Sequence, residues 1–287
     1  IMRNICNVLK CEIKDISGIE AIKAGLTNTS FKFRCNGKEY VYRHPGKDTE
    51  KFINRSSEAY SMQKARELGL DSTFIYMDSK EGWKVSEYIS DVRELDYRNE
   101  KQVDLALALI RKLHDADLVS EFDFDIWART LDFTKKLKSE GRDDFEGYDE
   151  LLSTMRQVMD LLKSDGYAKK HLCHNDCYSP NFLLDKDDNM YLIDWEYSGN
   201  DDPASDLGTF ICCSDYSFEE AEAVLKKYLK DDAEPGLLRH YTGYVAVCSY
   251  YWFIWALFQE SRGNHVGEWL YLWHRNARQF ASRFLKM

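Results

Sequence analysis

The chain has 287 residues, of which 44% are hydrophobic and 31% charged, as in an ordinary globular protein. Lys and Arg number 39 against 49 Asp and Glu, and the net charge of −10 argues against nucleic acid or an anionic membrane as main partner, because both attract clustered cations. Fifteen Gly and four Pro exclude a collagen-like or linker-rich chain. The length predicts two domains or one two-lobed unit.

Cysteine usage and hydropathy bear on the cellular compartment. The eight cysteines form no Cys-x-x-Cys pair, so we expect reduced thiols in a cytoplasmic protein. The first 15 residues lack the apolar core of a secretory signal. Residues 241–259 carry no charge and have the length of a membrane span. They contain Tyr, Thr, Ser and Gln, however, and the mean hydropathy of the chain is −0.54. We therefore predict a helix buried in a soluble domain, without membrane insertion.

The first third of the chain predicts a small unit of strands and one helix. Residues 10–47 read as strands, and Asn36-Gly37 divides two alternating segments as a tight hairpin turn would. A helical pattern over 50–69 ends at Gly69. Two more strands are expected, at 74–77 and 83–88. We assign residues 1–89 to an N-terminal nucleotide-binding lobe.

The remaining residues, 90–287, predict a mainly helical C-terminal lobe for catalysis and acceptor binding. Apolar residues recur at helical spacing in five segments, 103–117, 151–162, 218–229, 237–259 and 267–285. One group of short strands interrupts them, at 171–173, 182–184 and 190–193.

Three polar residues around the last of these strands carry the predicted chemistry. Asn181 follows Asp176 by five positions, and Asp194 ends an apolar strand thirteen positions later. This D-x-x-x-x-N…D spacing is typical of protein kinases, in which the first Asp accepts the hydroxyl proton and the other two residues hold Mg²⁺. Each residue taken singly also fits an ordinary turn or cap, because Asp and Asn favour turns.

Longer motifs extend this pattern to a family. H-N-D-x-x-x-x-N at 174–181, I-D-W-E-Y at 193–197 and D-L-G at 206–208 resemble the choline/ethanolamine kinase family, and more narrowly its bacterial choline kinases. The resemblance covers nearly the whole chain. It implies an α+β, bilobal protein-kinase-like fold, as in aminoglycoside phosphotransferases, with a small β-rich N-terminal lobe and a larger, mainly helical C-terminal lobe. It also implies ATP and Mg²⁺ as cofactors.

The resemblance further implies a nucleotide site in the first lobe. Arg43 stands where protein kinases keep a phosphate-binding Lys, and Glu58 would pair with it. A glycine-led turn would lie over the phosphates and a hinge would contact adenine through its backbone; their residues are Thr27, Asn28, Ser30, Glu87, Tyr88 and Ile89. Without the resemblance, the turn reads as a plain hairpin and Glu58 as a solvated charge. The chain has no P-loop motif.

The acceptor site follows from the chemistry of choline. A quaternary ammonium makes no ordinary hydrogen bond at its nitrogen, which has no N–H and no lone pair, so aromatic faces and carboxylates must hold it. Trp252 and Trp255 lie on one helical face, and Tyr197 and Tyr216 are further candidates. The alternative is a stripe of aromatic core residues. Trp273 and His274 could add to a cage.

One position departs from the family. Cys213 stands where the family often has an acidic residue for the cation, and Asp215 or Glu219 could replace it. Asp206 is interpreted as structural, and His174 as a residue that orients the catalytic loop.

The sequence thus predicts a cytoplasmic, ATP-dependent enzyme that phosphorylates choline to phosphocholine, a small-molecule substrate. Two alternatives stay open. One is the same reaction on ethanolamine, an aminoglycoside or another small alcohol. The other is a catalytically silent kinase-like binding module.

Overall fold

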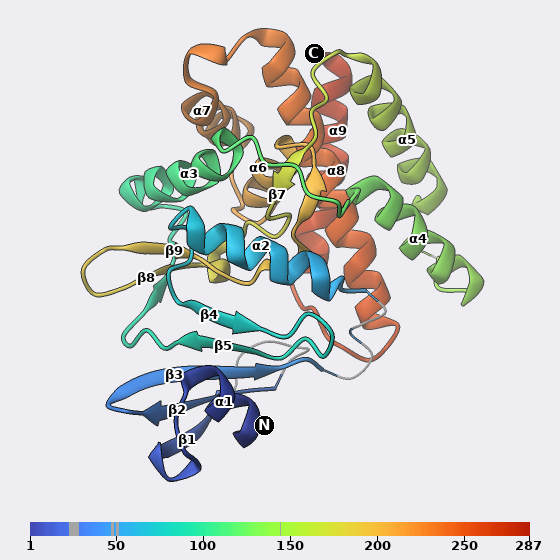
Figure 1. Cartoon of the computed structure of the whole chain (residues 1–287). Helices are drawn as coiled ribbons and strands as arrows, with labels where there is room; N and C mark the ends of the chain where they lie inside the picture. The colour runs from blue at the N-terminus through green and yellow to red at the C-terminus, as the bar shows by residue number, and fades with distance from the viewer. Residues whose placement is uncertain (23–28, 47–48, 50–51, 144) are drawn as a thin grey trace. The chain divides into compact units, whose positions relative to one another are not determined.

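A computed structural model (Figure 1) describes residues 1–22, 29–46, 49, 52–143 and 145–287. Contacts divide the chain into two compact units. Unit 1 contains residues 1–95 and 181–198, and unit 2 contains residues 96–180 and 199–287. The segment 181–198 therefore groups with the N-terminal residues, although part of unit 2 precedes it in sequence.

The main element of unit 1 is a five-stranded antiparallel sheet. Its strand order is β1-β2-β3-β5-β4, and the strands are β1 (Ile16–Ile22), β2 (Thr29–Cys35), β3 (Lys38–His44), β4 (Phe74–Met77) and β5 (Lys84–Glu87). Asn36 and Gly37 join β2 to β3 with φ angles of 49° and 77°. A tight hairpin turn requires positive φ at both positions, so the predicted hairpin is confirmed.

Two helices accompany this sheet: α1 (Met2–Leu9) precedes β1 in sequence, and α2 (Arg55–Glu67) lies between β3 and β4. Helix α1, followed by the short η1 (Ile13–Asp15), was not predicted; it buries Ile5 in a core with Phe33, Cys35, Tyr42, Trp83 and Val85. Helix α2 begins after Asn54, whose side chain accepts hydrogen bonds from the Ser56 and Ser57 N–H groups. Such a cap satisfies amides that the first helical turn leaves without a partner.

A second, three-stranded sheet completes unit 1 and contains the predicted hairpin. Its order is β6 (Arg93–Glu94), β8 (Phe182–Leu184) and β9 (Met190–Leu192). Asp185 closes the turn between β8 and β9 by accepting from the Asp187 and Asn189 N–H groups. Two short helical turns flank the hairpin, η3 (Ser179–Asn181) and η4 (Trp195–Tyr197).

Unit 2 is mainly helical. Its helices are α3 (Glu100–Asp115), α4 (Ile126–Ser139), α5 (Tyr148–Ser164), α6 (Ala204–Cys212), α7 (Phe218–Leu229), η5 (Lys230–Asp232), α8 (Pro235–Glu260) and α9 (Trp269–Lys286). Strand β7 (His171–Cys173) pairs with β10 (Gly199–Asp201). The predicted single group of strands is therefore two separate sheets, one in each unit. The predicted α+β class is confirmed.

Helix α8 is the centre of unit 2, and Figure 1 shows it beside α9. It is buried along most of its length, as predicted for 241–259. Helix α6 packs closely on it at Gly208, where an added Cβ would lie 2.6 Å from both the Tyr244 carbonyl oxygen and Cys248 Sγ. The D-L-G motif of the sequence thus lies within α6, and its glycine allows close helix packing. In the described part of the chain, no helix combines the length and apolar character needed to cross a bilayer.

All eight cysteines are free thiols. Cys6 and Cys11 are partly exposed, and the other six are buried.

Candidate functional site

A row of polar residues crosses the sheet of unit 1. Arg43 of β3 pairs with Lys84 of β5 on one side and with Ser30 of β2 on the other. Directly opposed residues of antiparallel strands project from the same face. The predicted phosphate-site residues Ser30 and Arg43 therefore lie next to each other, with a second cation beside them.

The Arg43 guanidinium makes two short ion pairs with the segment after β9. It lies 2.6 Å from Asp194 Oδ1 and 2.9 Å from Glu196 Oε2. Burial opposes its charge, but these two carboxylates raise the pKa of Arg43. Burial and the neighbouring Asp194 raise the pKa of Glu196.

Glu58 does not make the predicted ion pair with Arg43. Its side chain is 1% exposed, and its two oxygens pair with Lys84 Nζ at 2.9 Å and with Arg55 at 2.6 Å. Burial alone would raise the pKa of Glu58, but Lys84 and Arg55 lower it. The reason for the correction is geometric. Lys84 reaches the α2 carboxylate, while Arg43 is held by Asp194 and Glu196. Lys84 also lies 3.7 Å from Asp194 Oδ1.

The carboxylates of Glu58, Asp194 and Glu196 form one cluster. One oxygen from each lies within 4.8 Å of the others, and oxygen donors are the ligands that Mg²⁺ prefers. The donor set thus fits the ion that we expected at Asp194. The sequence analysis missed Glu196 as a carboxylate of this cluster, and it missed Lys84 and Arg55 as the cations that pair with Glu58. The only sequence signal for Glu196 is its place in the D-W-E motif.

The other predicted residues of unit 1 lie as follows. Asn181 is buried at the end of η3, and its carbonyl oxygen accepts from the Ile193 N–H. In the predicted hinge, the Glu87 N–H donates to the Thr73 carbonyl oxygen, and the Tyr88 N–H donates to the Glu39 carbonyl oxygen. The Ile89 N–H has no such bond among the described residues. Tyr197 ends η4 and is half-buried. Thr27 and Asn28 lie outside the described residues.

Asp176 belongs to unit 2, in a loop that Asp206 holds. The Asp206 carboxylate is fully buried and accepts from the backbone N–H groups of His174, at 3.0 Å, and Asn175, at 2.6 Å. The Asp176 N–H donates to His174 Nδ1 at 3.2 Å. These bonds agree with the predicted structural role of Asp206 and orienting role of His174.

Four indoles form a cluster between α8 and the start of α9. Trp252 lies 5.5 Å from Trp255 and 5.9 Å from Trp273 between ring centroids, and Trp269 stacks on Trp273 at 5.4 Å. Trp252 is 4% exposed, whereas Trp255 is half-buried. The structure therefore brings Trp252 and Trp255 together, adds Trp273 as anticipated, and adds Trp269, which the sequence analysis missed.

The remaining candidates of unit 2 already have partners. Cys213 Sγ accepts from the Trp273 indole N–H at 3.4 Å, and Asp215 pairs with Arg275 at 2.5 Å. His274 packs against Phe253.

Tyr216 has two contacts in unit 2. Its hydroxyl donates to the Tyr97 carbonyl oxygen at 2.8 Å, and the Arg98 guanidinium lies over its ring, 5.4 Å from the centroid.

The chain is similar to several known proteins. The chain is 24% identical to the protein LicA of Haemophilus influenzae over 85% of its own length and 74% of that protein. It is 26% identical to a probable ethanolamine kinase of Arabidopsis thaliana, over 84% of its own length and 72% of that protein. The solved choline kinase LicA of Streptococcus pneumoniae superposes with a TM-score of 0.80 at 23% identity, covering 98% of this chain and 97% of that one, which shows a shared fold. Residues 18–242 match the phosphotransferase enzyme family, and the chain belongs to that family.

Proposed function

We propose that this protein is a choline kinase, which transfers the γ-phosphoryl group of ATP to the hydroxyl of choline and yields phosphocholine. Membership of the phosphotransferase family supports the transfer. The indole cluster around Trp255 is the observation that carries the choice of choline.

The cation row of unit 1 suits a nucleotide site. Arg43 and Lys84 supply positive charge for phosphates, with Ser30 beside Arg43. We extend this site to Thr27, Asn28, Glu87, Tyr88 and Ile89. In the hinge, the Ile89 N–H is the amide that no described neighbour engages.

The carboxylates of unit 1 suit a metal. We assign Mg²⁺ to Asp194 and Asn181, with Glu196 next to Asp194. When bound, Mg²⁺ neutralises charge on the phosphates. Arg43 pairs with both carboxylates, so a metal ion at Asp194 would compete with Arg43 for the same oxygens.

Asp176 is the proposed base. In the reaction, the choline oxygen forms a bond to the γ-phosphorus, the bond from that phosphorus to the ADP oxygen breaks, and the hydroxyl proton passes to the Asp176 carboxylate. The backbone bonds from His174 and Asn175 to Asp206 support a fixed loop for this role.

Indole faces suit a quaternary ammonium better than a primary one. A cation over an indole face is stabilised without a hydrogen bond, but the N–H groups of ethanolamine also need acceptors. The indole N–H groups are donors, and those of Trp252 and Trp273 donate to Thr209 and Cys213. Trp255 and Trp269 are the partly exposed members of the cluster, and Trp255 is the main candidate. Tyr197 and Tyr216 are secondary, since the Tyr216 ring already carries Arg98.

Ethanolamine is the second candidate, because a thiol stands at position 213 and one relative is a probable ethanolamine kinase. For either substrate, the free thiols and the need for ATP support a reaction in the reducing cytoplasm.

The test is ADP release with choline, ethanolamine, dimethylethanolamine and ethanol as acceptors. We expect choline to have the highest kcat/KM. Asp176→Asn should lower kcat by roughly 100-fold or more and leave ATP affinity unchanged, while the exposed-turn control Asp187→Asn should match the wild type. Near-normal turnover in Asp176→Asn, or equal rates with choline and ethanol, would contradict the proposal.

A further inference from the structure

We infer that His114 is a positioning residue for Asp176 and acts through the carboxylate of Asp206. This inference rests on the proposed role of Asp176 as base. His114 is distant in sequence from the motifs that indicated function, and no pattern marked it. Its buried imidazole nevertheless contacts the group that holds the catalytic loop.

The first step is the set of donors around Asp206. Oδ1 accepts from the Asn175 N–H, while Oδ2 accepts from the His174 N–H and lies 2.9 Å from His114 Nε2. Burial would raise the pKa of Asp206, but His114 and the backbone N–H of His174 lower it. Asp206 is thus a buried carboxylate that accepts from two backbone N–H groups and from the His114 imidazole, and the Cys177 thiol also contacts it. A buried charge depends on every donor that it has.

The second step is the backbone that Asp206 holds. Asn175 has a φ angle of 65°, which is uncommon for a residue other than Gly and persists only when the surroundings hold it. Asp206 binds the amides of this residue and of the one before it, and Ser205 Oγ donates to the Asn175 side chain at 2.9 Å. Asp176 is the next residue, so the orientation of Asp206 sets the direction in which Asp176 leaves the turn.

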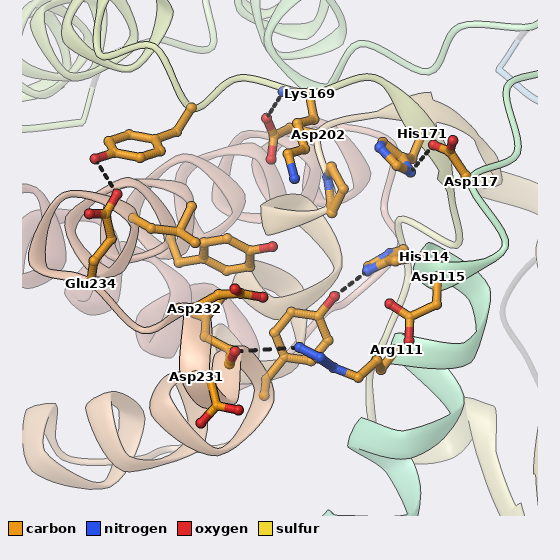
Figure 2. A pocket seen from close by; sticks show the side chains of 16 residues that line it. Arg111, His114, Asp115, Asp117, Lys169, His171, Asp202, Asp231, Asp232 and Glu234 are labelled. Atoms are coloured by element: carbon orange, nitrogen blue, oxygen red, sulfur yellow. Dashed lines mark hydrogen bonds and ion pairs between the residues drawn. The ribbon is translucent and has the colours of Figure 1, made fainter.

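The third step is the fixed orientation of the imidazole. His114 Nδ1 lies 2.7 Å from the Tyr228 hydroxyl, a bond that Figure 2 shows as the dashed line from His114. The Asp206 carboxylate can only accept, so Nε2 is the donor of that contact, and the Tyr228 hydroxyl then donates a hydrogen bond to Nδ1 of the neutral ring. The proton of a neutral imidazole is then on Nε2, directed at Asp206. His114 also borders a cavity of about 670 Å³, which limits the packing cost of a shorter side chain.

The test uses variants that separate the two ring nitrogens. In His114→Gln the amide NH₂ can take the place of Nε2 and donate to Asp206. In His114→Asn it reaches only the position of Nδ1, and His114→Ala offers no donor. We expect kcat to fall roughly tenfold or more in the Asn and Ala variants, and to stay within about threefold of wild type in the Gln variant. The KM for ATP and for the acceptor should stay within about twofold in all three, because no binding group is removed.

His240 provides a matched control. It is also a buried histidine between two carboxylates, Asp165 at 2.7 Å and Asp202 at 3.3 Å. Among the described residues neither carboxylate accepts from the 174–176 backbone. His240→Ala should lower the melting temperature as much as His114→Ala does, but leave kcat unchanged.

A second measurement is independent of the acceptor. Amide hydrogen exchange at His174 and Asn175 should accelerate in the Asn and Ala variants and stay slow in the Gln variant. If another alcohol proves to be the acceptor, the choline proposal fails, but exchange and kcat with that alcohol still decide this inference. It is overturned if kcat falls equally in Gln, Asn and Ala, if His240→Ala has the same effect on kcat, or if exchange accelerates without loss of kcat.

Discussion

Replacement of Lys84 by Met tests the buried charge network of unit 1. Lys84→Met keeps most of the side-chain volume but leaves Glu58 with Arg55 as its one hydrogen-bonded cation. Removal of one partner from a buried ion pair costs about 3–5 kcal/mol. Because Arg55 remains at 2.6 Å, we expect a loss near the lower limit, about 3 kcal/mol of unfolding free energy at pH 7. Urea denaturation followed by circular dichroism measures this loss.

The stability lost in Lys84→Met should also depend on pH, in a direction that the pKa of Glu58 sets. Lys84 and Arg55 hold the pKa of Glu58 below its usual value, so the network stabilises the fold above the pKa of an unfolded Glu, about 4.3, and this stability is lost as pH falls through the folded pKa. The difference in unfolding free energy between wild type and Lys84→Met should therefore be largest at pH 7 and decrease below about pH 4. Lys226→Met is the control, since Lys226 pairs with Glu222 at the surface and such pairs contribute about 0–1 kcal/mol.

The double variant Lys84→Met, Glu58→Gln should recover more than half of the loss, because it removes the uncompensated charge. A loss below about 1 kcal/mol in the single variant, or no recovery in the double variant, would refute the argument that Glu58 depends on Lys84.

Three further predictions address other parts of the molecule. Gly208→Ala should cost about 1–3 kcal/mol, measured as a lower melting temperature, because its Cβ would meet Tyr244 and Cys248 at 2.6 Å; unchanged melting would contradict the close packing of α6 on α8. Burial raises the pKa of Asp201 to about 7, so this group lowers stability as pH rises from about 4 to 7; the stability of Asp201→Asn relative to wild type should increase over that range, and a flat difference would argue against the raised pKa. Trp255→Ala should raise the choline KM roughly tenfold with the ATP KM unchanged, and Trp255→Phe should recover part of the loss; equal shifts in both KM values would indicate a packing role.

Local signals predicted the fold well. The turn at Asn36-Gly37 depends on two adjacent residues, and the limits of α7 are those predicted, because a capping Ser217 and a regular apolar face mark them. Helix α6 was missed for a physical reason. All nine of its residues are buried, so its sequence has no alternation between polar and apolar faces.

The candidate site was less predictable because its contacts are long-range. Asp176, Asn181 and Asp194 were predicted from their spacing within one short segment. Lys84 and Glu58 are 26 positions apart, and Arg43 is 151 positions from Asp194. Sequence spacing carries no information on which of two cations on neighbouring strands reaches a given carboxylate, and the pairing of Glu58 was predicted wrongly for that reason.

The six buried thiols can be used to measure local opening of the protein by chemical labelling. Burial raises the pKa of Cys173, Cys177, Cys212 and Cys248 and also that of Cys6 and Cys11, so the difference in reactivity comes from exposure, and only Cys6 and Cys11 are partly exposed. An alkylating reagent at neutral pH should therefore modify Cys6 and Cys11 first and reach the others only when the surrounding structure opens. Cys35 reports on unit 1, and the thiols of α6 and α8 report on unit 2. Peptide mass spectrometry during labelling would then show which unit each substrate protects when ATP or choline is added alone.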